Sequence, residues 1–492
     1  MTPFPFDAAI AVLVVPAVAA AALALVPGYR AGARLNVAAS LATFLAALSL
    51  LAGGGREAGR YLFVDELNIV FIVLNTFVGF TASLFSASYI GHELESGRIS
   101  PANLRFYHAM YQTMMFGMNL AFVANNIGLI WVAVELATLT TVLMVGLYRT
   151  HEALEAAWKY FILGSVGIAL ALFGTILVYM AAQPVVGEGD DAMVWTMLVD
   201  HAAGFDAALL NLAFVFLLIG YGTKVGLAPL HAWLPDAHAE GPTPISAVLS
   251  GLLLNVALYA VLRFKMLLAA NPDALAPGPL MVGMGLVSLV FAAFMLYRRR
   301  DIKRLFAYSS IEHMGIVVFA FGIGGPLANF AGLLHMVMHS LTKSAIFYCV
   351  GHIAQLRGTQ KLAEISGLTV TNPALGWAFV LAVAAIAGLP PMGVFMSEFL
   401  LVTSTFAARP WLALPLVLGL LTAFGALMLR ATEVAFGAPP AAPPAAAAPP
   451  PAAPPALSYV PIYVHLALVV AAGIFLPPAL VGWFRHVAGL LG

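Results

Sequence analysis

The sequence predicts an all-α polytopic membrane protein, and three observations support this fold class. Apolar residues make up 62% of the 492 residues and charged residues only 9%, whereas about a quarter of a soluble domain is charged. The apolar residues gather in runs of about 20, the length with which a helix crosses a bilayer. The formal net charge is zero, so no basic surface suggests a nucleic-acid partner.

Polar or Gly/Pro-rich joints divide the apolar runs into about fourteen predicted spans. The first run has no basic residue in front of it, so we interpret it as a retained span and not as a cleaved signal peptide. The weakest division is at Asn125-Asn126, which separates two spans that almost touch. The spans are expected near residues 8–26, 35–53, 66–90, 107–125, 127–148, 157–182, 207–230, 243–270, 277–297, 303–323, 325–353, 373–400, 409–435 and 459–483.

The lysines and arginines of the joints indicate how these spans are oriented. With the N-terminus outside, the inner joints hold fourteen of these residues and the outer joints six, while Lys224 and Lys343 fall within spans. Cytoplasmic loops carry the excess of positive charge in membrane proteins. We therefore expect a multi-pass protein of the inner (cytoplasmic) membrane of a bacterium or archaeon, with both termini extracytoplasmic.

Residues 437–456 form a Pro/Ala tract that we interpret as a semi-rigid linker before the last span. The single cysteine, Cys349, excludes a disulfide framework and a Cys-rich zinc or iron–sulfur site made by this chain alone. The sequence also has no phosphate-binding loop, nucleophile elbow or haem-attachment motif. We expect no cofactor in this chain and no redox chemistry by this chain alone.

Five ionisable residues lie inside apolar stretches. A charge at the bilayer centre costs about 3 kcal/mol on insertion scales, so such residues are functional candidates by default. One of them, Glu135, lies in NNIGLIWVAVELATLTTVLMVGLY and is interpreted as a proton-carrying carboxylate, with a structural ion pair as the alternative. The five residues are Glu135, Lys224, Glu312, Lys343 and Glu398.

Lys224 lies just before a helix break at GLAP. Burial favours the neutral form of a lysine, whereas a nearby carboxylate favours the charged form. A lysine under both influences can take up and release a proton as its partner moves. We hypothesise that Glu135 is this partner; the alternative is a static salt bridge.

His335, His339 and Lys343 recur every four residues, so they share one face of a helix. Histidine titrates near neutral pH, which favours a proton relay along this row. Structural hydrogen bonding is one alternative and a zinc site is another, because two histidines four residues apart can chelate. The glutamate of the HExxH zinc motif is missing, so we expect no metal.

The remaining candidates flank these groups. Glu398 follows the break AGLPPMG and is interpreted as an exit-side carboxylate. Glu312 and His313 are expected near the inner end of their span, in a structural or a coupling role. His231 and His238 are expected beside a cytoplasmic loop, as proton input or as bystanders.

The broken segments around Lys224 and Glu398 lie five predicted spans apart. Each span reverses the direction in which the chain crosses the membrane, so an offset of five spans, an odd number, gives the second segment the opposite orientation. Paired interrupted helices in opposite orientation are typical of transporters built from inverted repeats.

Three segments carry a resemblance to a known family. GTKVGLAPLHAWLPDAHAEGPTPISAVLSG, DIKRLFAYSSIEHMG and AGLPPMGVFMSEF resemble the antiporter-like membrane subunits of respiratory complex I, Mrp-type cation/proton antiporters and membrane-bound hydrogenases. The likeness runs from about residue 65 to 435, and SSIEHMG with the compact length most resembles the hydrogenase-4 component F branch.

The resemblance implies fourteen spans with two inverted five-helix repeats, each containing a broken helix. It also implies a proton path along the middle of the membrane, formed by Glu135, Lys224, His335, His339, Lys343 and Glu398. The implied divisions are 1–100 for three N-terminal helices, 101–272 and 273–436 for the two repeats, 437–456 for the linker and 457–492 for the last helix.

The sequence departs from the family at two points. Asn255 stands in SGLLLNVALYAVLRF, where many members have a lysine or histidine that bridges the two halves. An asparagine can orient water but cannot titrate. The long lateral helix of the largest complex I member is also absent, which argues against that subunit.

We therefore expect a proton-translocating membrane subunit of a redox-driven respiratory or hydrogenase-type complex. Its expected partners are other membrane subunits, the lipid bilayer, and a soluble redox arm with iron–sulfur clusters and a nickel–iron or quinone-reactive centre. A Na⁺ or K⁺/proton antiporter subunit and a non-conducting scaffold subunit are the alternatives, and Asn255 keeps the second of these open.

Overall fold

Long α-helices make up most of the chain in the computed structural model, which describes residues 7–53, 58–439 and 455–492. Isolated bridges are the only β-pairing among these residues. The first eleven helices are α1 (Ala8–Leu25), α2 (Tyr29–Gly53), α3 (Glu66–Glu95), α4 (Pro101–Val123), α5 (Ile127–Val145), α6 (His151–Val186), α7 (Trp195–His201), α8 (Ala207–Val225), α9 (Trp233–Glu240), α10 (Thr243–Val248) and α11 (Leu254–Ala269). This confirms the helical fold class.

The second half of the chain continues the same architecture. A π-helical turn, Leu249–Leu253, joins α10 to α11. Most of the predicted Pro/Ala linker, 437–456, lies outside the described residues. The remaining helices are α12 (Gly278–Leu296), α13 (Ile302–Ile323), α14 (Gly325–Arg357), α15 (Leu368–Thr371), α16 (Pro373–Ile386), α17 (Gly393–Ala408), α18 (Pro410–Phe436), α19 (Val460–Ile474) and α20 (Pro478–Leu490).

Short polar side chains mark where many of these helices begin. Asp65, Ser100, Asn126, Asp206 and Asp301 each accept a backbone N–H in the first turn that follows. Such N-caps satisfy amide groups that have no partner within the helix. The cap at Asn126 is the reason that the closely spaced fourth and fifth predicted spans are separate helices.

Eleven helices of the described chain are long and apolar enough to cross a membrane, so the predicted count of fourteen is not confirmed. α16 and α17 are apolar but shorter, and the predicted span 373–400 is divided between them. α4 and α14 are long, but they carry several buried polar side chains. The last predicted span, 459–483, was too long, because Pro477-Pro478 interrupts it and α19 ends at Ile474.

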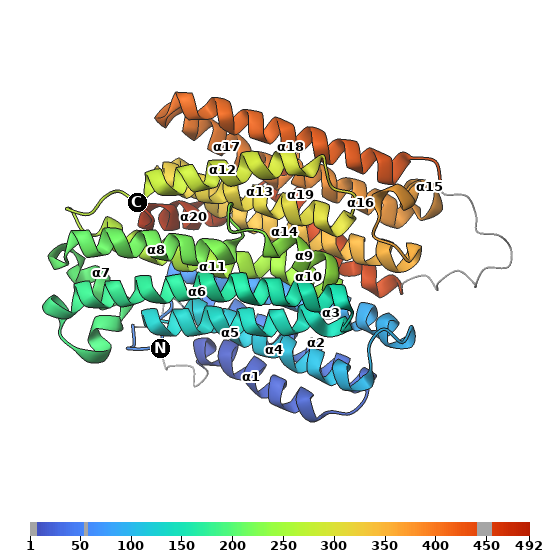
Figure 1. Cartoon of the computed structure of the whole chain (residues 1–492), viewed down its shortest axis with the longest axis horizontal. Coiled ribbons are helices and arrows are strands. Elements are labelled where there is room, and N and C mark those ends of the chain that lie inside the picture. Colours follow the sequence, from blue (N-terminus) through green and yellow to red (C-terminus); the bar gives the residue numbers. More distant parts are fainter. Residues whose placement is uncertain (1–6, 54–57, 440–454) are drawn as a thin grey trace.

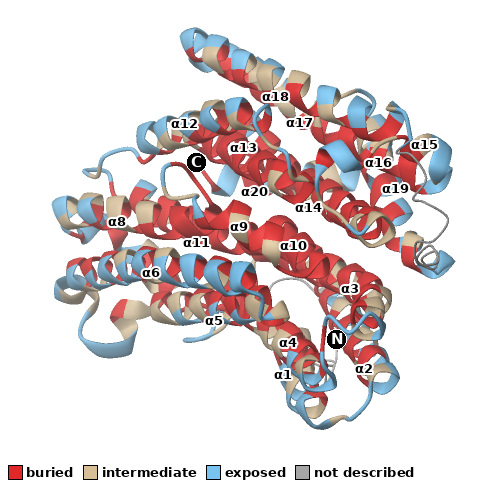
Figure 2. Ribbon diagram, turned by 45° about the vertical axis from the view of Figure 1, so that its right-hand side comes forward, coloured by how far each residue is buried: buried red, intermediate tan, exposed pale blue. Residues whose placement is uncertain are grey.

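The helices lie side by side around a buried centre (Figure 1). α14 contacts α3, α10, α13, α16, α17, α19 and α20, and therefore joins the early and late parts of the chain. The span Thr243–Ala269, formed by α10, the π-helical turn and α11, is buried except near its end, at Met266 and Ala269. Figure 2 shows buried residues along these central helices and exposed residues on the outer faces of α6 and α18.

The two expected breaks are present. α8 ends at Gly226, which has φ +80°, and the chain turns before α9. The freed backbone groups find partners, because the Ala228 N–H donates to Ser288 Oγ at 2.9 Å and the Trp233 indole N–H donates to the Thr223 carbonyl at 2.8 Å. A second break, after α16, contains Gly388 at φ +72°.

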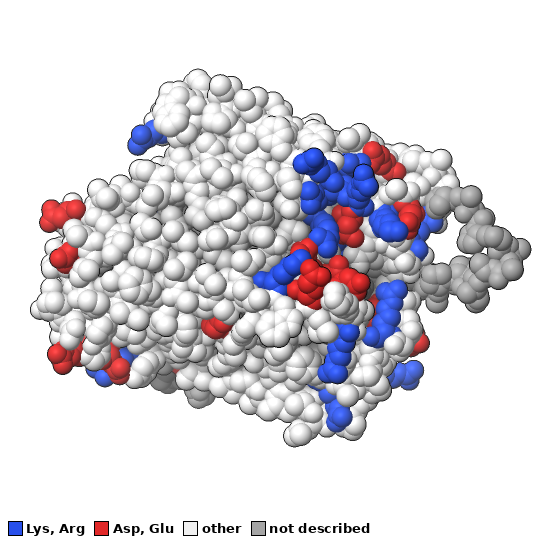
Figure 3. All heavy atoms as spheres, viewed as in Figure 1, with Lys and Arg blue, Asp and Glu red and all other residues white. Residues whose placement is uncertain are grey.

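Charge is distributed unevenly over the surface. Figure 3 shows a broad face that is almost free of Lys, Arg, Asp and Glu, with a small acidic spot in its lower middle, and most of the Lys and Arg in that view lie toward one end. Arg98 and Lys303 lie at this basic end, where α3 ends and α13 begins. Uncharged sides with charged ends are what a bilayer-spanning bundle requires.

Candidate functional site

A buried ion pair connects α5 and α8. Lys224 Nζ lies 3.1 Å from Glu135 Oε2, and the two side chains are 1% and 17% exposed. Lys224 occupies the last turn of α8 because the helix stops at Gly226. The carbonyl end of a helix is partially negative, so the break also stabilises the ammonium group. The hypothesised Glu135–Lys224 contact is therefore confirmed.

A second group of buried polar side chains lies on the π-helical turn and on α11, α13 and α14. Asn255 Nδ2 donates to Ser340 Oγ at 2.7 Å, and Ser250 Oγ lies 2.7 Å from Ser310 Oγ. Asn255 Oδ1 has no hydrogen-bond partner among the described residues. Asn255 thus lies at the junction of the two halves, because it connects α11, in the first predicted repeat, to α14, in the second. Its side-chain oxygen is a free hydrogen-bond acceptor, but the side chain cannot titrate.

The predicted row His335, His339 and Lys343 is buried on α14. Lys343 Nζ donates to the Phe306 carbonyl at 2.6 Å. Neither ring nitrogen of His339 has a hydrogen-bond partner within the described chain. The ring lies 5.5 Å, between centroids, from that of His313. A buried histidine without partners is available to exchange protons with its neighbours.

His313 and His335 form the best-connected part of the site. His313 Nδ1 lies 2.9 Å from His335 Nε2, and His335 Nδ1 lies 2.9 Å from Ser397 Oγ on α17. On the other side, His313 Nε2 lies 3.1 Å from Glu312 Oε2. These contacts give a line of titratable groups that crosses from α13 through α14 to α17.

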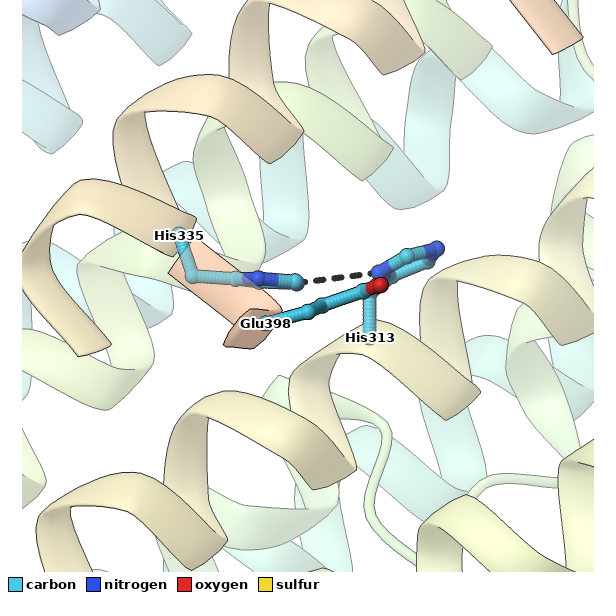
Figure 4. A group of neighbouring side chains, drawn as sticks. All are labelled: His313, His335 and Glu398. Carbon is cyan, nitrogen blue, oxygen red and sulfur yellow. Dashed lines mark hydrogen bonds between the residues drawn. The ribbon is translucent and has the colours of Figure 1, made fainter. Parts of the chain in front are cut away.

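Glu398 completes this line on α17. A carboxylate oxygen of Glu398 and one nitrogen each of His313 and His335 lie within 4.8 Å of one another (Figure 4). Imidazole and carboxylate groups at such separations suit a proton relay and also suit a metal. The expectation of no metal stays a prediction. The two imidazoles are joined directly by a hydrogen bond.

Two predicted locations were wrong. Glu312 and His313 lie in the middle of α13, not near its end, because the helix begins at Ile302 and ends at Ile323. His238 is not a loop residue but a fully buried residue of α9, and its ring stacks on Phe347 at 4.8 Å. His231 does lie in the loop between α8 and α9, where it is partly buried.

Four buried charged residues were not among the predicted candidates. Arg263 and Lys265 lie buried in α11. Glu93 and Lys303 lie inside the basic end, fully or almost fully buried. Glu93 and Lys303 belong to locally polar stretches, HELESGR and RRRDIKR, and nothing in such a stretch distinguishes it from a solvated joint. Arg263 and Lys265 lie in the apolar run LYAVLRFKMLLAA.

The helical bundle and this row of buried charges define a class of ion-translocating membrane proteins. The chain belongs to the transmembrane family of NADH:quinone oxidoreductase and Mrp antiporter subunits, which matches residues 124–424. This confirms the resemblance found in the sequence.

Among its relatives, a hydrogenase-4 component F homolog of Methylacidiphilum infernorum is 60% identical over 98% of this chain and 99% of the relative. NADH-quinone oxidoreductase subunit M of Rhodobacter capsulatus is 27% identical over 81% of this chain and 79% of the relative.

Solved structures have the same fold. A chain of the archaeal membrane-bound sulfane sulfur reductase superposes with a TM-score of 0.85, at 20% identity, over 98% of this chain and 97% of that one. A chain of the Mrp complex from Dietzia sp. DQ12-45-1b gives 0.83 at 18% identity, over the same shares of the two chains.

Proposed function

We propose that this chain is the proton-translocating membrane subunit of a redox-driven respiratory or hydrogenase-type complex. The observation that carries the proposal is the Glu135–Lys224 ion pair, in which the lysine is buried. Hydrogen-bonded polar groups on α11, α13 and α14, which include Asn255–Ser340 and His313–His335, supply further steps across the bundle. Relatives named hydrogenase-4 component F homolog and NADH-quinone oxidoreductase subunit N, the latter 28% identical, support the same assignment.

The geometry provides a way to move a proton. While Glu135 lies beside it, the Lys224 ammonium group is stabilised at 1% exposure. If the pair separates, burial favours the neutral amine and Lys224 releases its proton. Water oriented by Asn255 and Ser340 would pass the proton to Lys343 and His339. The His313–His335 hydrogen bond then leads to Glu398.

The energy for separating the pair must come from outside the chain. The proposed partners are neighbouring membrane subunits, which would move Glu135 relative to Lys224, and a soluble redox arm with iron–sulfur clusters and a nickel–iron or quinone-reactive centre. The proposed location is a bacterial or archaeal cytoplasmic membrane, with the basic end inside.

Replacing Lys224 tests the proposal. Lys224→Met in the whole complex should lower proton translocation at least tenfold while assembly and electron transfer from the soluble arm persist. Lys265→Met is the matched control, because Lys265 is also buried but donates to the Leu491 carbonyl, away from the line. Normal translocation by Lys224→Met would refute the mechanism.

A role in cation/proton antiport is the second candidate. A Na(+)/H(+) antiporter component of Alkalihalophilus pseudofirmus is 26% identical over 75% of this chain and 72% of the relative. An imposed Na⁺ or K⁺ gradient would then drive proton movement in vesicles without any redox substrate. Cation dependence of this kind would replace the redox-driven proposal.

A further inference from the structure

A cavity of about 430 Å³ lies at the basic end of the bundle, apart from the site described above. We call it the vestibule. Its wall includes Tyr89, Arg98, Lys303, Ala354 and Gln355, from α3, α13, α14 and the joint that follows α3. A space of this size holds roughly a dozen waters. The Arg98 side chain, 55% exposed, brings the wall to the protein surface.

Glu93 lies directly behind this wall. Its side chain is 0% exposed, Oε1 accepts from Gln355 Nε2 at 2.9 Å, and Oε2 lies 3.6 Å from Arg98 Nη1. Glu93 Oε2 has no hydrogen-bond partner among the described residues. Glu93 is therefore a buried carboxylate that faces a cation but has an oxygen without a hydrogen bond, and such a group in a native structure calls for an explanation.

A row of polar groups leads inward from the vestibule. Lys303 donates to the carbonyls of Ala239 and Gly241 at 3.2 and 2.7 Å. His238, next to Ala239, lies within electrostatic range of both Lys303 and Lys343. Both nitrogens of the His238 ring lack hydrogen-bond partners in the described chain.

The end of this row is the central lysine. The His238 ring stacks on Phe347, which lies one helical turn beyond Lys343 on α14. His238 therefore lies between the vestibule wall and the relay on α14. Neither Glu135 nor Lys224 belongs to the vestibule wall.

We propose that the vestibule is the proton intake of the second half, with Glu93 as the residue that collects protons for Lys343. This inference rests on the proposed function. A proton from water at the mouth binds Glu93 Oε2, and the acid then releases it to water inside the vestibule. From there it moves past Lys303 and His238 to Lys343; no electron is transferred and no other bond is broken.

Cysteine labelling tests whether the vestibule holds water from the predicted inner side. The native Cys349 is buried, so Ala354→Cys provides a single reactive site in the wall. A membrane-impermeant maleimide should label this variant in inside-out vesicles at least tenfold faster than in right-side-out vesicles. Ala345→Cys, fully buried on the same helix, should stay unlabelled. Absence of labelling at Ala354→Cys, or labelling from the opposite side, would refute the intake.

Charge removal tests Glu93 itself in the whole complex. Glu93→Gln should slow proton translocation at least fivefold, and Glu93→Asp should restore most of it. Formate, a small weak acid, should accelerate Glu93→Gln but leave wild type and Lys224→Met unchanged. Glu95→Gln, two residues away and exposed, is the control and should behave as wild type.

The outcomes separate this inference from the proposed function. A Glu93→Gln variant that pumps normally, while Lys224→Met does not, would refute the intake alone. A slow Glu93→Gln variant that formate does not rescue would assign Glu93 a structural role, as a link between α3 and α14, and would also refute the intake. Normal pumping by Lys224→Met would refute the proposed path through the first half.

Discussion

At the scale of single residues, helix breaks determine the positions of Lys224 and Glu398 in the candidate path. Lys224 lies in the last turn of α8, two residues before Gly226, and Glu398 follows the break that contains Gly388. A Cβ atom at Gly388 would overlap the Glu398 carboxylate. The glycine therefore serves both the turn, through its positive φ, and the space that the carboxylate needs.

Gly388→Ala should displace the Glu398 carboxylate and slow proton translocation about tenfold, with a loss of stability of about 1 kcal/mol. Gly325→Ala is the control, because Gly325 also has a positive φ, of +78°, but nothing lies within 4 Å of its added Cβ. Translocation and thermal midpoint should be measured together. Equal effects of the two variants on translocation would show that backbone strain alone is responsible.

Asn255 provides a second residue-scale prediction. Asn255→Leu should slow translocation at least fivefold, because Ser340 Oγ loses its donor and the junction loses its free acceptor. Asn255→His should retain activity, since an imidazole can both accept and donate protons. Translocation by membrane vesicles is the measurement, and an active Asn255→Leu variant would show that the two halves are connected elsewhere.

At the scale of elements, an interrupted helix persists inside a bilayer only if its freed backbone groups are paired. The α8–α9 break meets this condition through Ser288 on α12, which accepts from the Ala228 N–H, and through Trp233. The break is thus held by a neighbouring helix. A break held in this way keeps Lys224 in place. Separation of the ion pair would then occur by movement of Glu135.

Ser288→Ala should leave the Ala228 N–H unsatisfied and destabilise the protein by about 1–2 kcal/mol. The thermal unfolding midpoint in detergent measures this effect. Ser404→Ala is the comparison, because the Ser404 hydroxyl is buried but donates only to a carbonyl of its own helix, α17. A midpoint for Ser288→Ala no lower than for Ser404→Ala would show that the break does not depend on this hydrogen bond.

At the scale of the whole molecule, contacts between distant segments close the bundle. Arg263 of α11 makes two hydrogen bonds, of 2.7 and 2.8 Å, to Asp65 at the start of α3. Burial by itself would raise the pKa of Asp65, but the Arg263 guanidinium and its hydrogen bonds lower the pKa below its usual value. At the C-terminus, the Gly492 carbonyl accepts from Asn329 Nδ2 and from the Gly325 N–H.

The Asp65–Arg263 pair predicts a pH dependence of stability. Because folding lowers the pKa of Asp65, its contribution is present above about pH 4, its unfolded value, and is lost as the pH falls through the folded value. Thermal midpoints of the wild type should therefore decrease below pH 4. Asp65→Asn should remove this part of the decrease and also lower stability at pH 7 by about 3 kcal/mol, since Arg263 stays buried. A wild-type slope in Asp65→Asn would assign the acid sensitivity to other carboxylates.

The position of the termini gives a prediction about topology. α1 begins and α20 ends away from the basic end, as Figure 1 shows for the marked ends of the chain. A reporter fused after Gly492 should therefore be extracytoplasmic, with phosphatase active and a fluorescent protein dark. A reporter placed between α14 and α15 should behave in the opposite way. The reverse pattern would invert the proposed orientation and place the vestibule outside.

The sequence by itself determined the fold class and the two breaks, and it predicted six residues of the candidate path. Apolar runs, proline pairs and charges within spans are local signals, because each depends on what a bilayer accepts at that point of the chain. The family resemblance also depends on contiguous segments. The bounds of the two repeats remain a prediction.

Only the tertiary structure decided which buried charges meet. Glu135 and Lys224 are 89 residues apart in the chain, and Arg263 and Asp65 are 198 apart. Glu93 and Lys303 belong to segments that look solvated in isolation, and packing of α3, α9, α13 and α14 withdraws them from water. Burial is a property of the assembled bundle, so a polar stretch read alone cannot distinguish a surface joint from the wall of an internal cavity.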